Sequence, residues 1–199
     1  MRATFLMMVL LLGSSALAGG GPLQTLKQKN TEVDRLLRLK TDPGSNAEKK
    51  QKDEIKALAS TLLDYSELSK RALQGHWDKL SKMQRDEFVA TLRGLIERNY
   101  VRQLRSNLDY DIVYRNEELS GNEATVNSQV KVKTEGKSTD VEIVYKLRKL
   151  SGEKWMVYDV ITDEVSLVRN YRSQFHKIIT EKSYDELLKK MKSKLKEGG

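Results

Sequence analysis

Apolar residues recur at intervals of three and four through the first hundred residues, which is the spacing of helices with one buried face. Residues 23–40 form the first such stretch, and the turn-forming residues 41–46 end it. In the next helix the apolar positions fall at i, i+3, i+4, i+7 and i+8: Ile55, Leu58, Ala59, Leu62 and Leu63. The pattern therefore predicts two amphipathic helices joined by a short loop.

Two further helices are predicted before residue 110. The shorter, at residues 64–73, stops before Gly75, a residue that commonly ends helices. Ser81 and Gln84 have the spacing of a capping box, so we expect a helix to begin there. This helix has the widest apolar face in the chain: Phe88, Leu92, Leu95, Ile96, Tyr100 and Leu104.

The period then changes to two, as in half-buried strands. Strands are predicted at residues 110–114, 123–133, 139–148 and 154–161, with turns at 120–122, Gly136 and 151–152. In the second and third strands, Val130, Val132, Val141, Ile143 and Tyr145 should face inward. In the last strand, alternation puts Trp155, Val157 and Ile161 on one face and Met156, Tyr158 and Val160 on the other.

Helical spacing returns after residue 165, and a capping pattern at 183–186 begins a last helix whose tail, from about residue 192, should fray. The predicted fold class is α+β: an antiparallel sheet of three to five strands, wrapped by N- and C-terminal helices. A curved sheet covered in this way is expected to enclose an apolar cavity.

The N-terminus predicts export. Arg2 precedes an apolar run at residues 5–12, and Ala16-Leu17-Ala18 has the small-x-small form of a signal-peptidase site. The run is too short for a membrane anchor, which needs about 20 apolar residues, so a retained anchor is the weaker interpretation. We expect a signal peptide at 1–18, cleaved near Ala18, and a single periplasmic domain at 19–199.

Composition narrows the function further. The chain has no cysteine, so packing alone must hold the fold, and its net charge of +8 falls to +7 without Arg2. Basic and acidic residues alternate along the chain, which favours a solvated surface and argues against a nucleic-acid partner. No nucleophile elbow, zinc-protease motif or phosphate-binding loop is present. His76 and His176 have no Cys or carboxylate at ligand spacing, so no metal or cofactor is predicted.

Two stretches resemble a known family. The first contains Asp-Tyr at 64–65, Leu-Ser-Lys-Arg-Ala-Leu at 68–73 and Trp77; the second contains Trp-Met-Val-Tyr-Asp-Val at 155–160 and Val-Ser-Leu-Val-Arg-Asn-Tyr-Arg-Ser-Gln-Phe at 165–175. Both are similar to the MlaC family of periplasmic auxiliary proteins of ABC transporters, and the likeness runs from about residue 33 to 195. One departure is Thr-Asp-Glu at 162–164, where the family usually has an apolar or glycine-containing turn.

The resemblance implies a carrier that holds the acyl chains of a glycerophospholipid and leaves the headgroup near solvent. It also implies two partners, an inner-membrane transporter subunit with an MCE domain and an outer-membrane lipoprotein complex. No catalysis is expected. Two alternatives stay open: a small periplasmic enzyme with an acid–base pair such as Asp159 and Tyr145, and a ligand-free adaptor with a fully packed interior.

The candidate pocket residues are apolar or aromatic positions of the strands and of the helices beside them. Alternation by itself favours an ordinary core for the strand positions, but the last strand is apolar on both faces, which favours a pocket. Trp77 and Tyr100 suit either a pocket mouth or packing at helix ends. Arg172 is expected to pair with a lipid phosphate or, by preference, with an internal acid such as Asp159. The candidates are Trp77, Phe88, Leu92, Tyr100, Val130, Val132, Val141, Ile143, Tyr145, Trp155, Val157, Tyr171 and Phe175.

Overall fold

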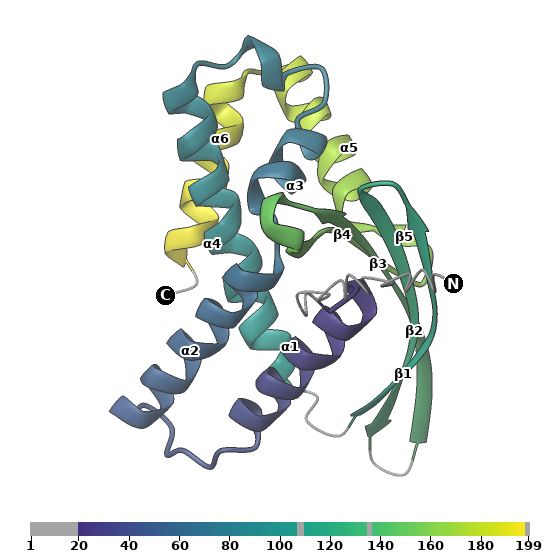
Figure 1. Ribbon diagram of the computed structural model, residues 1–199. Helices are drawn as coiled ribbons and strands as arrows, with labels where there is room; N and C mark the ends of the chain where they lie inside the picture. Colours follow the sequence, from purple (N-terminus) through teal and green to yellow (C-terminus); the bar gives the residue numbers. More distant parts are fainter. Residues whose placement is uncertain (1–19, 107–109, 135–136, 198–199) are drawn as a thin grey trace, which may run out of the picture.

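A computed structural model describes residues 20–106, 110–134 and 137–197 (Figure 1). The predicted signal peptide and Gly136 lie outside the described residues, as does the side chain of Tyr100. The helices are α1 (Pro22–Leu37), α2 (Asn46–Leu62), α3 (Tyr65–Ala72), η1 (Trp77–Lys79), α4 (Lys82–Ser106), η2 (Ser151–Glu153), α5 (Leu167–Glu181) and α6 (Tyr184–Glu197). The strands are β1 (Tyr110–Ser120), β2 (Glu123–Thr134), β3 (Lys137–Lys149), β4 (Trp155–Thr162) and β5 (Val165–Ser166).

Side-chain caps begin several helices where the sequence predicts them. Ser81 and Gln84 form the expected capping box of α4: the amide of Gln84 donates to Ser81 Oγ at 3.2 Å, and the amide of Ser81 donates to Gln84 Oε1 at 2.9 Å. Ser166 accepts from the amide of Arg169 at 3.0 Å at the start of α5. Each cap satisfies amides that have no partner inside the helix, which fixes where the helix begins.

The strands form one antiparallel sheet in the order β1-β2-β3-β4-β5, which confirms the predicted α+β class. In Figure 1 the sheet curves around α1, and α4 and α6 lie side by side at the other end of the molecule. Pairing of Val126 with Tyr145 and of Val130 with Val141 puts the alternating apolar residues of β2 and β3 on one face, the inner face that α1 covers. This agrees with the phase predicted for these two strands.

A bulge in β4 corrects the predicted phase of the last strand. Leu147 pairs with Val157 but Lys146 pairs with Asp159, so β4 has one extra residue at this point. Beyond the bulge, Val160 is opposite Tyr145 and shares the inner face, whereas Ile161 points to the outer face. Strict alternation placed these two residues the wrong way round because it assumes an unbroken ladder.

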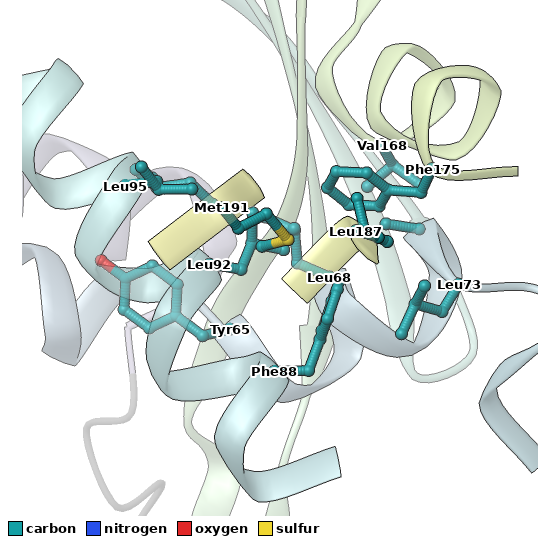
Figure 2. Packing of buried hydrophobic residues seen from close by; sticks show 12 residues of the cluster. Tyr65, Leu68, Leu73, Phe88, Leu92, Leu95, Val168, Phe175, Leu187 and Met191 are labelled. Atoms are coloured by element: carbon teal, nitrogen blue, oxygen red, sulfur yellow. The ribbon is translucent and has the colours of Figure 1, made fainter. Parts of the chain in front are cut away.

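Most of the buried apolar residues belong to three packed clusters. The helical cluster joins α3, α4, α5 and α6 around Phe88, Leu92 and Phe175 (Figure 2). The sheet cluster packs Leu26 of α1 on inner-face residues such as Val126 and Leu147. The third cluster joins the second half of α1 to α2: Val33, Leu36, Leu37 and Ile55, with Leu58 against them.

The predicted fraying from residue 192 is wrong up to Glu197, because α6 stays helical to that residue. Leu195 packs on the helical cluster, and Arg98 of α4 donates to the main-chain oxygens of Lys194 at 2.5 Å and of Leu195 at 3.2 Å. These bonds satisfy carbonyls that the end of a helix otherwise leaves unpaired. The last turn is therefore held by α4.

Candidate functional site

The structure separates the predicted pocket residues into two groups. Phe88 and Leu92 have no exposed surface and belong to the helical cluster with Phe175, while Trp77 and Tyr171 pack against that cluster in partly buried positions. The rings of Phe88 and Phe175 meet edge to face at 5.5 Å between centroids. Side chains fill the space around these residues, so this group is a packed core.

The second group lies on the inner face of the sheet. Trp155 and Val157 are buried in the sheet cluster, where Tyr145 packs in a partly buried position. Further along β2 and β3 the inner face stays apolar, but its residues are less fully buried. Val130 is buried, whereas Val132, Val141 and Ile143 are only half-buried. None of these four residues belongs to any of the three packed clusters of the described chain.

β1 adds apolar positions that the sequence predicted as strand but did not assign to a face. Ile112 pairs with Val130, and Tyr110 pairs with Val132, so both lie on the inner face next to the predicted residues. The period-two spacing of Tyr110, Ile112 and Tyr114 is the signal that identifies them. We call Ile112, Val130, Val132, Val141 and Ile143 the apolar band.

α1 explains why the apolar band is only partly covered. The first half of α1 is fixed to the sheet, since the amide of Leu23 donates to the carboxylate of Glu117 at 2.6 Å and Leu26 is fully buried in the sheet cluster. The second half packs on α2 through the third cluster, which contains no sheet residue. The first half of α1 therefore covers one end of the inner face, whereas the apolar side chains of its second half contact α2.

The border of the apolar band carries two tyrosines. Tyr114 bonds to the side chain of Asn30, and the ammonium of Lys27 lies 5.8 Å from the centre of its ring. Burial raises the pKa of both Tyr110 and Tyr114, and the nearby carboxylate of Asp34 adds to the rise for Tyr110. Both hydroxyls are therefore neutral at pH 7, and the edge of this hydrocarbon face carries them beside the ammonium of Lys27 and the carboxylate of Asp34.

The acid–base pair considered for an enzyme is not formed. Asp159 is buried, and its carboxylate accepts from Ser166 Oγ at 2.6 Å and from the amide of Val168 at 3.0 Å at the start of α5. By the strand register Asp159 is on the outer face and Tyr145 on the inner one. The predicted ion pair of Arg172 with Asp159 is also not formed, because Arg172 donates to the main-chain oxygen of Arg71. Asp159 is a helix cap.

The two histidines lie together, although they are far apart in the sequence and no motif associates them. Nε2 of His76 is 3.0 Å from Nδ1 of His176, which joins the chain just before η1 to α5. Burial, together with the positive charge that His176 and Lys79 bring close, lowers the pKa of His76. The described residues contain no group of three or more His, Cys, Asp or Glu side chains placed to hold a metal ion.

In the described part of the chain, no helix is both long and apolar enough to cross a membrane.

Comparison with known proteins gives three agreeing results. The model of the MlaC protein family matches residues 28–193. The intermembrane phospholipid transport system binding protein MlaC of Haemophilus influenzae is 26% identical over 196 residues, covering 94% of this chain and 88% of that protein. A phospholipid-binding protein from Ralstonia solanacearum, solved in complex with a phospholipid, has the same fold with a TM-score of 0.69. It is 19% identical, and the alignment covers 88% of this chain and 97% of that one.

Proposed function

This chain belongs to the MlaC family, and we propose that it is a periplasmic carrier that binds a glycerophospholipid by its acyl chains against the apolar band. The observation that carries the proposal is the apolar band itself, which is half-buried except at Val130 and belongs to none of the packed clusters of described residues. The names of the two relatives, one a phospholipid transport protein and the other bound to a phospholipid, support the same ligand.

Burial of hydrocarbon is sufficient to hold such a ligand. Each methylene removed from water contributes about 0.8 kcal/mol. Burial of several methylenes of two acyl chains against Val130, Val141 and Ile143 therefore gives strong binding without an ion pair. Ordered polar contacts are needed only at the opening, where neutral hydroxyls suit the ester region. The charged headgroup stays in water because its burial without a partner is costly.

The proposed cycle places this chain between two membranes. Residues 1–18 direct export and are removed, and the domain from residue 19 takes a lipid at one membrane complex and releases it at another. The partners are an inner-membrane transporter subunit with an MCE domain and an outer-membrane lipoprotein complex. The domain contributes a hydrocarbon-lined binding face and no catalytic step, consistent with the use of Asp159 as a cap.

The test begins with the full chain, expressed with its own N-terminal segment in a bacterial periplasm and purified without detergent. Organic extraction and mass spectrometry should find close to one phospholipid per protein, and the mass of the intact protein locates the cleavage site. An empty protein would contradict the carrier function and favour the ligand-free adaptor.

Steric filling of the apolar band then locates the ligand. Val130→Trp or Val141→Trp should remove bound phospholipid and leave a folded protein, because the larger ring occupies the space of the acyl chains. Val113→Trp is the matched control, since Val113 is exposed on β1 and pairs with Gln129 on the outer face. Wild-type lipid content in folded Val130→Trp and Val141→Trp proteins would exclude the apolar band as the binding face.

A further inference from the structure

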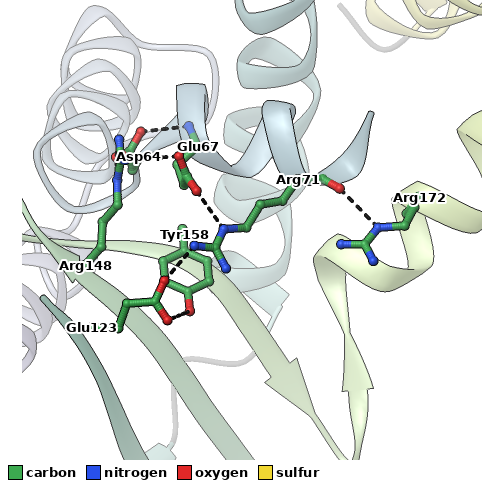
Figure 3. A network of polar contacts seen from close by, with 7 residues as sticks. All are labelled: Asp64, Glu67, Arg71, Glu123, Arg148, Tyr158 and Arg172. Carbon is green, nitrogen blue, oxygen red and sulfur yellow. Dashed lines mark hydrogen bonds and ion pairs between the residues drawn. The ribbon is translucent and has the colours of Figure 1, made fainter. Parts of the chain in front are cut away.

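Three carboxylates hold α3 against the outer face of the sheet (Figure 3). Asp64 accepts from Nε and Nη2 of Arg148 at 2.7 and 2.6 Å. Glu67 accepts from Nη1 of Arg148 at 3.0 Å and from Nε of Arg71 at 2.7 Å. Glu123 accepts from Nη2 of Arg71 at 2.7 Å, and this bond lowers the pKa of Glu123 despite partial burial. Two arginines therefore engage all three carboxylates.

Arg172 lies beside this network but has no carboxylate partner in it. Its Nε donates to the main-chain oxygen of Arg71 at 3.1 Å, and Figure 3 shows no contact between its terminal nitrogens and the three carboxylates. No ion pair of Arg172 is found among the described residues. The side chain is half-buried, so water stabilises its charge less than on an open surface. The two terminal nitrogens of the Arg172 guanidinium therefore have no acidic side chain as a partner among the described residues.

The fork opens into a groove between α3 and α5. One hollow of about 290 Å³ contains Arg172, and an adjoining hollow of about 300 Å³ extends toward η1; the two share Gln74 and Arg172. We call this the α3–α5 groove and define it by Gln74, Trp77, Arg169, Arg172, Ser173 and His176.

A second guanidinium lines the same groove. Arg169 is three residues before Arg172, which places both on one face of α5. Its Nη2 donates to the main-chain oxygen of Glu164 at 3.0 Å, so its hydrogen-bond partner is neutral as well. Two like charges repel at this spacing, and an anion bound between them removes that repulsion.

The acidic residues of the groove do not supply this anion. Glu67 is engaged by Arg71 and Arg148. Asp78 is 93% exposed and lies 3.9 Å from Arg85, outside contact with Arg172. The charge balance of the groove is therefore positive, and its natural ligand is negative.

The shape of the groove selects among anionic ligands. Two joined hollows are longer than one phosphate ion, and their walls add a side-chain amide, a hydroxyl and the indole of Trp77 to the two arginines. Arg and Trp are enriched at the energetic centres of protein interfaces. The network behind the groove uses outer-face residues, Glu123 and Arg148, whereas the apolar band is on the inner face, so the two sites are separate.

We propose that the α3–α5 groove docks an acidic segment of a partner protein, with a carboxylate of that segment held by the terminal nitrogens of Arg172. Gln74 and Ser173 then bond the main chain of the segment, and Arg169 pairs with a second carboxylate. The bidentate geometry of an arginine fork on a carboxylate gives this contact direction as well as charge.

The test measures binding of a blocked hexaglutamate peptide to the full chain, purified from the periplasm, by backbone amide chemical shifts at low salt. Shifts should concentrate at Gln74 and at residues 169–176, and a blocked hexaglutamine peptide should produce none. Arg172→Gln should weaken binding about tenfold, as expected for a charged hydrogen-bonded pair. Arg172→Lys should recover part of it, since it retains the charge but not the fork.

Matched variants separate this contact from general electrostatics and from folding. Lys190→Gln removes one exposed charge on α6, outside the groove, and should leave peptide affinity unchanged. Arg169→Gln repeats the test at the second arginine of the groove, which donates to the exposed main-chain oxygen of Glu164. Phospholipid content should stay at the wild-type level in the Arg172 and Arg169 variants, because the groove is separate from the apolar band.

Four results would overturn the proposal. These are equal weakening by Lys190→Gln and Arg172→Gln, peptide shifts centred outside the groove, loss of phospholipid in the folded Arg172 variants, and Arg172-dependent binding of inorganic phosphate or phosphatidylglycerol vesicles that matches or exceeds peptide binding. The last result would assign the groove to a small anion or a membrane surface.

Discussion

The helical cluster around Phe88 and the apolar band around Val130 contain the same kinds of residue, yet they are covered in different ways. Side chains from four helices enclose Phe88 and Leu92 completely. The apolar band lies opposite a helix, α1, whose second half packs on α2. An apolar pattern thus predicts a buried face, but only the neighbouring elements decide whether the protein itself or a ligand completes the burial.

The comparison is tested first by truncating one side chain of each region to alanine. Phe88→Ala should lower the free energy of unfolding by about 3–5 kcal/mol, because it leaves a cavity in a filled core. Ile143→Ala in the apolar band should cost about 1 kcal/mol or less in lipid-free protein, since the side chain is half-exposed. Denaturant unfolding of both variants after lipid extraction measures the difference.

The Ile143→Ala and Phe88→Ala variants should also differ in how bound phospholipid changes the outcome. With phospholipid bound, Ile143→Ala should reduce lipid retention, whereas Phe88→Ala should reduce stability by a similar amount with and without lipid. A loss of about 2 kcal/mol or more for Ile143→Ala in lipid-free protein would mean that the apolar band is a filled core too.

A smaller effect is expected at a turn that belongs to neither region. Asp163 and Glu164, in the departure from the family pattern at 162–164, have φ angles of 44° and 67°, which non-glycine residues adopt at a cost. Glu164→Gly should raise the free energy of unfolding by about 0.5–1 kcal/mol by removing this strain. Asp163→Gly should gain less, since Asp163 Oδ1 accepts from the amide of Glu142 at 3.2 Å. No change in the midpoint of denaturation for Glu164→Gly would show that the turn is unstrained.

The smallest change is expected with pH near neutrality, at the helical end of the molecule. His76 has a folded pKa below the ordinary 6.5, so as pH falls through 6.5 the unfolded chain takes up a proton first. Stability is therefore complete above pH 6.5 and decreases between 6.5 and the folded pKa. His176→Gln should reduce this slope in urea unfolding because it removes the electrostatic contribution of His176 to the lowered pKa of His76, while the part due to burial remains.

Lipid binding at the apolar band is expected to show no such dependence on pH. Its bordering tyrosines have raised pKa values and stay neutral, so phospholipid content should be constant from about pH 8 to about pH 5.5. Release of lipid in step with His76 titration would instead link the two regions.

Much of the fold was predictable because the signals for it are local. The capping box at Ser81 and Gln84, the strands at residues 123–133 and 139–148, and the change of period from helix to strand all depend on residues near one another in sequence. The motifs at residues 155–160 and 165–175 also carried the resemblance to the family that the comparisons confirm. For the inner face, alternation correctly assigned Val130, Val141 and Tyr145 to one side.

The tertiary structure alone decided which of those apolar residues are core and which form the apolar band, because coverage depends on elements distant in sequence. The bulge at Tyr158, between Val157 and Asp159, exchanged the faces of Val160 and Ile161, and no alternation pattern contains an inserted residue of this kind. His76 lies against His176, one hundred residues away in sequence, and Arg172 lies beside Arg71 with no ion pair to any acid in the described part of the chain. These contacts follow from how α3 and α5 pack together, whereas sequence periodicity records only the face that each element buries.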